Sequence, residues 1–474
     1  MIISNKTTTT WSKVLETPAQ GFPLTPLSVI SGSIPPQLKG SLYRNGPARL
    51  EIGGNKVGHW FDGDGAILAV HFAEGKAIAT YRYVQTPGYR AETKANRYLY
   101  ANYGMRASGG FWNNWLKGVK NSANTSVLPL SDRLLALWEG GKPYALDLHN
   151  LETTGIDNLG HTLKSNFSAH PKIDPQTREI YNFGVTPGKP TKINLYRCDK
   201  TGKVIRQNAI ALSDVPLIHD FVLTQKYLVF LISPVKVKLL PVIIGVKSYS
   251  EAMQWCPQLG TKILICDREN LSLVSQNTTE PWYQWHFTNG YEDQDGAIAI
   301  EFIHYDDFST NQYLKEVASG RTETSAEGKL WEVKIDPQTG CVISNHQLLD
   351  LPCEFPIVAP HKVSQPWRYT YFSTHRAGAI PEQDFFNAIA CLDRHTGDVA
   401  IADMGENIYP SEPIYVAHPD NPELGWLLSV VYDGDRDRSE VRIYQCDRLE
   451  EEPLCRLALP SRIPHSFHGA YLPG

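Results

Sequence analysis

This sequence has no closely spaced cysteine pair, no long apolar run and no excess of basic charge. Its eight cysteines stand singly along 474 residues. Zinc sites built from thiolates use close pairs, so a cysteine metal site is not expected. The lack of any stretch of about 20 apolar residues argues against a membrane-spanning helix. The net charge is -5, without a basic stripe, so the electrostatic footprint of a nucleic-acid-binding protein is missing.

The amino-terminal segment lacks the features of an export signal. Its opening, "MIISNKTTTTWSKVLETP", is polar and contains no apolar core of a secretory leader. We therefore expect a cytoplasmic protein without a disulfide framework. No feature of the sequence indicates an obligate protein partner.

What recurs in the sequence is a short hairpin pattern. An apolar strand ends in Asp, a polar turn follows, and another strand begins. The pattern occurs at Asp174, Asp199, Asp267, Asp336, Asp393 and Asp447. Most intervals are about 50 to 70 residues, which suits four-stranded blades stacked around an axis. This pattern favours a single all-β domain over 1–474 with the architecture of a β-propeller and an amino-terminal extension at 1–30. The alternative is a large β-sandwich with similar turns.

Two segments, 85–125 and 231–258, interrupt the strand pattern. Both interleave apolar side chains with lysine, and the first contains Phe111, Trp112, Trp115 and Leu116. Such segments can enter the interfacial zone of a bilayer. The alternative for each is a helix that packs its apolar face on the propeller. We expect a cap built from these insertions, and they raise the hypothesis of peripheral membrane association.

Four of the fifteen histidines have unusual surroundings. These are His170 in "FSAHPKIDP", His219 in "PLIHDFVLT", His286 in "YQWHFTNGYE" and His468 in "PHSFHGAY". Their spacings of 49, 67 and 182 residues exclude a local motif such as HExxH. They match one residue per blade, and the innermost strands of a propeller converge on its axis. One inward side chain from each blade could therefore meet at a metal ion; an ordinary hydrogen-bonded histidine is the alternative for each.

Several short blocks, taken in order, resemble the carotenoid cleavage oxygenase family. They are "LYRNGP", "FDGDG", "NTSVLPLSDRLLALWEGG", "AHPKIDP", "IHDFVLT", "CEFPIVAP", "SEPIYVAHP" and "PHSFHGAY", and they extend from about Gly40 to the carboxyl terminus. The resemblance implies a seven-bladed β-propeller with a small helical cap, one axial non-haem Fe(II) held by four histidines, and O₂ as co-substrate. The matching positions are His170, His219, His286 and His468.

The resemblance also implies neighbours of the iron. Glu139, Glu354 and Glu412 correspond to carboxylates that bond to the ligating histidines. A ligating imidazole needs a fixed acceptor for its other N–H, and carboxylates offset the metal charge. Which glutamate serves which histidine does not follow from the sequence. Thr125 matches a position where a methyl group limits access to an open coordination site, and His465 matches a variable position that is not a ligand.

Aromatic residues near these blocks are candidates for a substrate tunnel. They are Trp285, beside a predicted ligand, and Trp60 and Phe61, beside "FDGDG"; core packing is the alternative for each. The "FDGDG" block itself predicts a tight turn in which Gly63 and Gly65 can adopt positive φ and Asp62 or Asp64 can bond to nearby backbone.

The family's chemistry implies that O₂ splits a conjugated double bond of an apolar polyene into two carbonyls. Bacterial members of this length most resemble apocarotenoid 15,15'-oxygenases, which yield retinal-type aldehydes. Within the family, the alternatives are stilbene cleavage, cleavage of full-length carotenoids at 9,10 bonds, or isomerisation without oxygen. Stilbene cleavage needs a lysine and a tyrosine, for which Lys94, Tyr89 and Tyr98 are candidates. Two alternatives lie outside this family: a metal-free propeller that serves as a binding scaffold, and a propeller hydrolase with an axial calcium ion. Calcium prefers oxygen ligands, so four histidines argue against the hydrolase.

Overall fold

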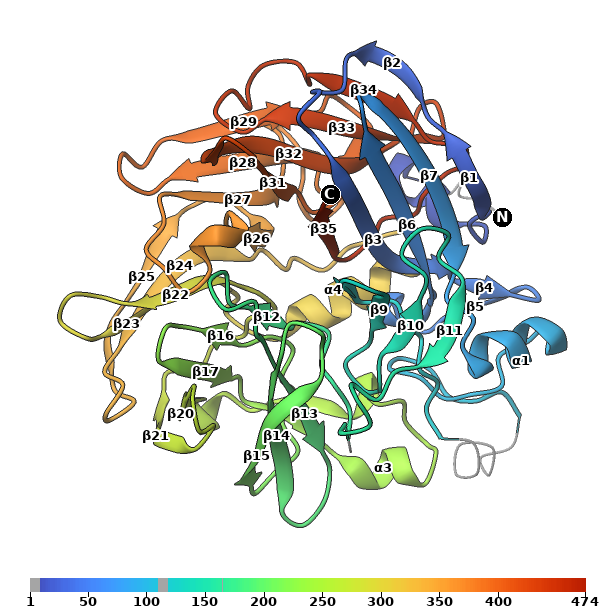
Figure 1. Ribbon diagram of the computed structural model, residues 1–474. Coiled ribbons are helices and arrows are strands. Elements are labelled where there is room, and N and C mark those ends of the chain that lie inside the picture. Colours follow the sequence, from blue (N-terminus) through green and yellow to red (C-terminus); the bar gives the residue numbers. More distant parts are fainter. Residues whose placement is uncertain (1–8, 110–117, 164) are drawn as a thin grey trace.

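Seven sheets stand around a common centre (Figure 1). The computed structural model describes residues 9–109, 118–163 and 165–474. Within these ranges each of the seven sheets has four to six strands, and neighbouring strands run antiparallel. The molecule is therefore a seven-bladed β-propeller with few helices, which confirms the predicted fold class and makes the β-sandwich alternative wrong.

The blades follow one another along the chain. Blade 1 contains β1 (Phe22–Pro26), β7 (Lys76–Tyr83), β6 (Asp64–Ala73), β3 (Gly40–Arg49) and β35 (Gly469–Pro473), and blade 2 contains β8 (Ser126–Pro129), β9 (Leu134–Leu137), β10 (Tyr144–Leu146) and β11 (Thr153–Ile156). Blade 3 contains β12 (Lys172–Ile173), β13 (Ile180–Thr186), β14 (Thr191–Cys198) and β15 (Val204–Leu212). Blade 4 contains β16 (Val222–Leu223), β17 (Tyr227–Ile232), β20 (Thr261–Asp267) and β21 (Leu273–Thr279).

The remaining blades continue the same order. Blade 5 contains β22 (Phe287–Glu292), β23 (Ile298–His304), β24 (Lys329–Ile335) and β25 (Val342–Leu349), and blade 6 contains β26 (Cys353–Ile357), β27 (Tyr369–Thr374), β28 (Ala388–Asp393) and β29 (Val399–Asp403). Blade 7 contains β30 (Ile408–Pro410), β31 (Ile414–His418), β32 (Asn421–Asp433), β33 (Arg438–Gln445), β34 (Cys455–Ala458) and β2 (Ser28–Gly32).

Shorter elements lie between these strands. The helices are α1 (Pro87–Ala95), α3 (Leu239–Ile243) and α4 (Ser309–Val317), with 3-10 turns η1 (Thr10–Leu15), η2 (Trp60–Asp62), η3 (Ser250–Ala252), η4 (Pro257–Leu259) and η5 (Pro360–Lys362). Two small hairpins pair β4 (Glu51–Ile52) with β5 (Asn55–Lys56), and β18 (Val235–Val237) with β19 (Met253–Trp255). No helix in the described ranges has the length and apolarity needed to cross a bilayer.

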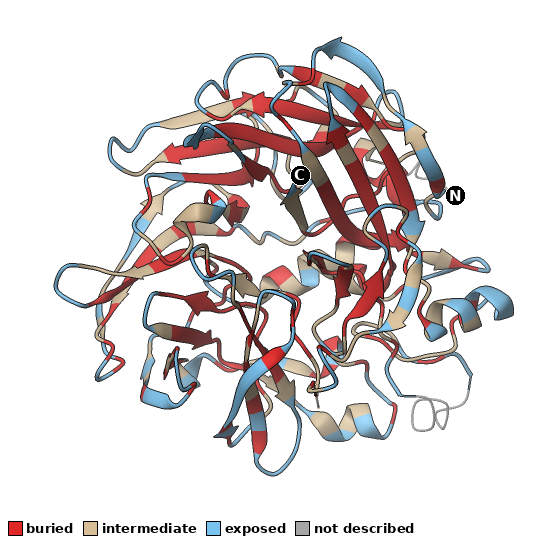
Figure 2. Ribbon diagram, in the orientation of Figure 1, coloured by how far each residue is buried: buried red, intermediate tan, exposed pale blue. Residues whose placement is uncertain are grey.

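Stacking of the blades explains why their central strands are apolar on both sides. In β6, Leu68 and Val70 pack between blades 1 and 7, whereas Ile67 and Ala69 pack between blades 1 and 2. Successive side chains of a strand point to opposite faces, so a strand between two neighbours buries both. Each junction between adjacent blades has a core cluster of this kind. Figure 2 accordingly shows buried central strands and exposed outer loops.

The aspartates of the predicted hairpins begin the turns. Oδ1 of each accepts an N–H from the residue two positions on, at 2.9 to 3.0 Å, and the residues are Asp174, Asp199, Asp267, Asp336 and Asp393. The sixth, Asp447, lies in the connection from β33 to β34. Side-chain bonds of this type stabilise a turn locally, which is why the pattern is visible in the sequence.

Both ends of the chain contribute strands that close the ring. Strand β35 pairs with β3, with Gly469 opposite Arg44, and its first residue directly follows His468. Strand β2 pairs with β34, with Ser28 opposite Ala458. Part of the segment expected to be an extension at 1–30 is therefore integral to blades 1 and 7, because β1 and β2 begin within it. This closure brings the carboxyl-terminal segment to the axis.

The "FDGDG" turn differs from its expected conformation. Gly63 has a φ of -63°, and Gly65 is likewise outside the left-handed region. Close packing explains the glycines instead. A Cβ at Gly63 would lie 2.6 Å from Cβ of Pro47, and one at Gly65 would lie 2.1 Å from the carbonyl oxygen of Ala123. The prediction of positive φ was wrong. Glycine is needed at these two positions because a Cβ would collide with neighbouring atoms, and not because the backbone adopts a left-handed φ.

Candidate metal centre

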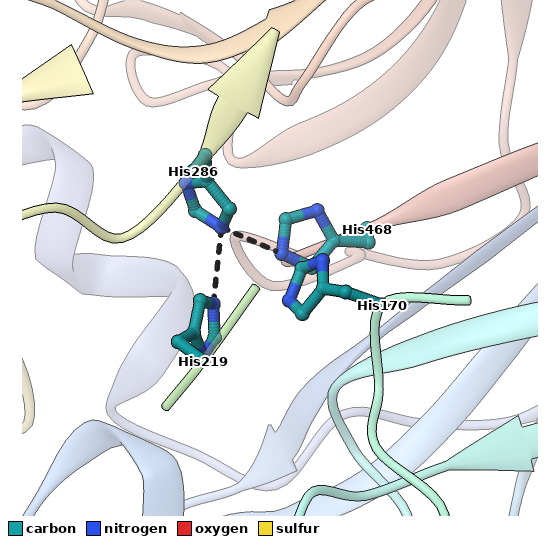
Figure 3. A group of neighbouring side chains, drawn as sticks. All are labelled: His170, His219, His286 and His468. Carbon is teal, nitrogen blue, oxygen red and sulfur yellow. Dashed lines mark hydrogen bonds between the residues drawn. The ribbon is translucent and has the colours of Figure 1, made fainter. Parts of the chain in front are cut away.

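Four blades each bring one histidine to the propeller centre (Figure 3). His286 and His468 stand directly before β22 and β35, while His170 and His219 stand two and three residues before β12 and β16. Each of these strands is at the end of its sheet that faces the axis. The spacing of the histidines along the chain therefore follows the spacing of the blades.

The imidazoles converge closely enough to share one ion. One ring nitrogen from each of the four lies within 4.8 Å of the others. Nε2 of His286 is 3.1 Å from Nε2 of His219 and 3.2 Å from Nε2 of His468. Nε2 of His170 is buried and has no hydrogen-bond partner in the described part of the chain. Buried polar atoms are rarely left unpaired, and a free imidazole nitrogen facing the other three rings fits a bound cation.

Three of these histidines contact a carboxylate through the other ring nitrogen. The pairs are Nδ1 of His219 with Oε1 of Glu139, Nδ1 of His286 with Oε2 of Glu354 at 2.5 Å, and Nδ1 of His468 with Oε1 of Glu412 at 2.9 Å. An Nδ1–H that donates to a carboxylate leaves a lone pair on Nε2. The structure thus supplies the pairing that the sequence left open, and it directs lone pairs at a common point.

Burial keeps part of this cluster uncharged. It lowers the pKa of His170 well below its ordinary value, and repulsion by the other three rings acts in the same direction. Burial also lowers the pKa of His468, although Glu412 opposes it. At His286 burial again disfavours the charged form, but Glu354 outweighs it and raises the pKa. Neutral imidazole nitrogens are good ligands for divalent first-row metals, and the donor set defines a four-histidine metal site.

Two of the carboxylates have further partners. Glu354 accepts the Tyr305 hydroxyl at 3.0 Å and the Phe355 N–H at 2.6 Å. Glu412 accepts Nη1 of Arg44 at 2.7 Å and the N–H of Gly469 at 2.9 Å. Burial alone would raise the pKa of either carboxyl group, but the adjacent histidines and these donors hold both pKa values below the usual range. The carboxylates are therefore charged and fixed in position.

Sequence reasoning did not single out these supporting residues. Arg44 belongs to the quoted block "LYRNGP" and Phe355 to "CEFPIVAP", which were the available signals, whereas Tyr305 lies in none of the quoted blocks. Phe355 has a φ of 54°, which is uncommon for a bulky residue. Its ring lies 5.4 Å from that of His286 and 5.5 Å from that of His468, centroid to centroid. Such strain occurs where the surrounding structure over-determines a functional site.

Thr125 stands directly before the inner strand of blade 2, as His286 and His468 stand before theirs. It directly precedes β8 and is buried. Its carbonyl oxygen accepts the N–H of His468 at 3.3 Å, and its hydroxyl donates to Oδ1 of Asn124 at 3.2 Å. Thr125 thus lies beside the metal centre, on the wall of the cavity described next.

A largely apolar cavity of about 470 Å³ adjoins the histidines. Its walls include all three predicted tunnel aromatics, Trp60, Phe61 and Trp285. Trp285 packs perpendicular to His219, with centroids 4.9 Å apart, and Phe61 lies 5.6 Å from Trp285. Trp60 and Trp285 are also buried in core clusters. Trp60 and Trp285 therefore line the cavity and pack in the core at the same time, and the role of the three aromatics in a substrate tunnel stays a prediction.

The two insertions cover one side of the cavity. Arg106 and Val119 come from the first, and Val242, Lys247 and Tyr249 come from the second. Phe111, Trp112, Trp115 and Leu116, which were predicted to face a membrane, lie outside the described residues.

Lys94, proposed from the sequence as a phenol-binding group, does not reach this cavity. It is exposed in the last turn of α1 and is not part of the cavity lining. Tyr89 of the same helix stacks on Tyr83, with centroids 5.1 Å apart, and Arg49 lies over its ring. The Lys94 hypothesis was wrong, because α1 packs against blade 1 rather than over the centre.

Comparison with known proteins places this fold and site in a family. Residues 16–473 match the model of the retinal pigment epithelial membrane protein (RPE65) family. The chain belongs to this family, the carotenoid cleavage oxygenases, and is a family enzyme with a four-histidine metal site. The binding-scaffold and calcium-hydrolase alternatives are thereby wrong.

Individual relatives show how far the similarity extends. The chain is 33% identical to apocarotenoid-15,15'-oxygenase of Synechocystis sp., over 93% of this chain and 92% of that protein. It is 28% identical to isoeugenol monooxygenase of Pseudomonas nitroreducens, over 94% of each. The crystal structure of cobalt-substituted Synechocystis ACO superimposes with a TM-score of 0.90 at 30% identity, covering 98% of both chains.

Proposed function

We propose that this protein is a non-haem Fe(II) dioxygenase that cleaves a conjugated double bond of an apocarotenoid, at the 15,15' position, to give retinal-type aldehydes. The observation that carries the proposal is the convergence of four imidazoles beside an apolar cavity of about 470 Å³. The bond specificity rests on the 33% identity to apocarotenoid-15,15'-oxygenase. A cavity of this size is in the usual range of roughly 300–1,000 Å³ for small-molecule sites.

His170, His219, His286 and His468 would hold the ion through one ring nitrogen each. Imidazole suits iron among other first-row metals, and the unpaired buried Nε2 of His170 fits a bound cation. Ferrous iron would supply the activation of O₂. The carboxylates of Glu139, Glu354 and Glu412 hold the rings in one tautomer and offset the metal charge.

The rest of the cavity would position the alkene. Phe61 and Trp285 form an apolar wall that joins His219, and Thr125 narrows the space beside the rings. A stiff polyene held by such walls presents one double bond to the centre, and orientation of this kind lowers the barrier of the reaction. The same walls exclude water from the reacting carbons.

Metal content and cleavage test the proposal together. Purified protein should contain one iron per chain by elemental analysis, and an apocarotenal incubated in detergent and air should give two carbonyl products. His219→Ala should lose both iron and cleavage. His346→Ala, at an exposed position of β25, is the matched control and should retain both. Wild-type iron content in His219→Ala would contradict the ligand assignment.

A second candidate is the cleavage of a phenolic alkene such as a stilbene. The similarity to isoeugenol monooxygenase favours it, and Lys247 with Tyr249 places an amine and a phenol on the cavity wall. A panel of apocarotenals, full-length carotenoids and hydroxylated stilbenes, with products separated by chromatography, decides between the candidates. Turnover of stilbenes alone would overturn the apocarotenoid assignment and leave the metal centre unaffected.

Substrate uptake would occur from a lipid surface. Both insertions carry exposed apolar side chains next to residues that line the cavity: Val119 is 60% exposed, and Leu240 and Ile243, which flank the lining residue Val242 within two positions, are 70% and 63% exposed. Lysines flank them, and mixed surfaces of this type bind at the bilayer interface. Leu240→Ser with Ile243→Ser should reduce co-sedimentation with anionic vesicles. Ile343→Ser, which removes an equally exposed apolar side chain on blade 5, should not; equal losses would refute this surface.

A further inference from the structure

His375 places an unpartnered polar group in the wall of the cavity. It directly follows β27 of blade 6 and lines the cavity together with Pro381, Phe385 and Phe386. Only 8% of the residue is exposed, and its Nδ1 is buried without a hydrogen-bond partner. Phe386 lies 4.9 Å from its ring, centroid to centroid. The polar ring is therefore set in an apolar environment that offers it no hydrogen bond.

Other buried histidines away from the metal centre are satisfied. Nδ1 of His59 accepts the N–H of Phe61 at 3.1 Å, and its Nε2 lies 3.2 Å from the carbonyl oxygen of Asn311. Nε2 of His465 donates to the carbonyl oxygen of Trp11 at 2.7 Å. No hydrogen bond of the His375 side chain occurs within the described residues, and burial alone lowers its pKa to about 4. An uncompensated buried polar group destabilises a fold, which points to a partner outside the protein.

The position of His375 relative to the metal centre suits one end of a long ligand. Phe355 contacts both His286 and His468. Phe386 contacts Phe355 at 6.4 Å and His375 at 4.9 Å, measured between centroids. Two aromatic rings thus separate His375 from the metal ligands along the cavity wall. A rod-shaped polyene with its reacting bond at the centre would pass these rings and end near the imidazole.

We propose that His375 is a subsite for an oxygen function at the end of the polyene, a hydroxyl of its terminal ring. Neutral imidazole has one donor and one acceptor nitrogen, so it can serve either role of a hydroxyl, and the flanking phenylalanines would hold the ring that carries it. His375 then selects hydroxylated over purely hydrocarbon end groups. This inference rests on the proposed function, because it takes a polyene as the ligand.

Binding without turnover tests the subsite independently of cleavage. The full-length protein is titrated under argon with two apocarotenals that differ only in a ring hydroxyl, and quenching of the cavity tryptophans reports Kd. A hydrogen bond of typical strength predicts that wild type binds the hydroxylated ligand about three- to tenfold more tightly. His375→Phe and His375→Leu should abolish the difference, whereas His375→Gln, which can still donate and accept, should retain most of it.

The outcomes separate the subsite from the reaction. An unchanged ratio of Kd values in His375→Phe and His375→Leu would overturn the subsite, as would the absence of any preference in wild type. Failure of wild type to bind either ligand would overturn it too. Binding with the predicted preference, but without cleavage of either ligand after admission of air, would refute the proposed function and support the subsite.

Discussion

Replacement of Arg44 by methionine should damage both stability and the metal centre. Arg44 is 1% exposed, and it donates to Glu412 at 2.7 Å, to Ser466 at 2.9 Å and to the carbonyl oxygen of Phe467 at 3.0 Å. These contacts fix the segment that carries His468. Methionine keeps much of the side-chain volume but removes every donor and leaves the Glu412 carboxylate buried without its cation.

The size of the effect follows from that buried charge. Removal of one partner of a buried ion pair costs about 3–5 kcal/mol. With an unfolding entropy of about 2 cal/mol/K per residue, a chain of this length loses about 3–5 °C in Tm for that change. Loss of a group that orients a metal-ligating histidine typically costs about 10–100-fold in metal affinity. Arg44→Met should therefore lower Tm and bind iron more weakly.

Calorimetry and a chelator titration measure these two effects. Arg462→Met is the matched control, because Arg462 pairs with Asp437 at 2.9 Å on the surface, where an ion pair contributes about 0–1 kcal/mol. Its Tm should change by about 1 °C or less, and its iron affinity should not change. An Arg44→Met protein that matches this control in both Tm and iron affinity would show that Arg44 does not support Glu412 and His468.

Other predictions concern stability and ring closure. Burial lowers the pKa of His465 to about 4, so the unfolded chain binds more protons below its ordinary value of about 6.5, and stability falls on acidification. Between pH 7 and pH 5, protonation of this group in the unfolded chain should lower the free energy of unfolding by about 2 kcal/mol. In urea titrations, His465→Gln should therefore lose less stability over this pH range than wild type. The same pH dependence in both proteins would contradict the prediction. Gly469→Ala would bring a Cβ to 2.6 Å from the carbonyl oxygen of Tyr43 and 2.5 Å from Cδ of Arg44. The free energy of unfolding should fall by about 1–3 kcal/mol, and the iron content should fall too. Gly378→Ala is the control for iron content: its φ of 83° strains the backbone locally, but its Cβ meets no atom within 4 Å, so iron content should not change. Full iron content in Gly469→Ala would refute the role of this strand.

Much of the fold was predictable because its information is local and repeated. Each blade turn carries its own aspartate, whose bonds to the next residues do not depend on the rest of the chain. The spacing of the four histidines pointed to a shared centre, because each precedes an inner strand and radial symmetry brings these strands together. Symmetry alone left an ordinary hydrogen-bonded histidine possible at each position, and the assignment of these four as ligands came from the family resemblance.

What could not be predicted depends on how distant segments meet. The histidine partner of each carboxylate depends on contacts between different blades, and Glu412 is also held by Arg44 from the other end of the chain. The left-handed φ of Phe355 has no sequence signal, and the glycines of "FDGDG" were misinterpreted because close approach and positive φ favour the same residue. The Lys94 prediction failed because the sequence around Lys94 does not indicate that α1 packs against blade 1 and away from the cavity.

Anomalous diffraction at the iron edge, on crystals of the purified protein, tests the central metal site most directly. We expect a single strong peak on the propeller axis, coordinated by Nε2 of His170, His219, His286 and His468, with full occupancy. A peak bonded to fewer than four of these nitrogens, or the absence of any peak between the four rings in protein purified with iron, would contradict it.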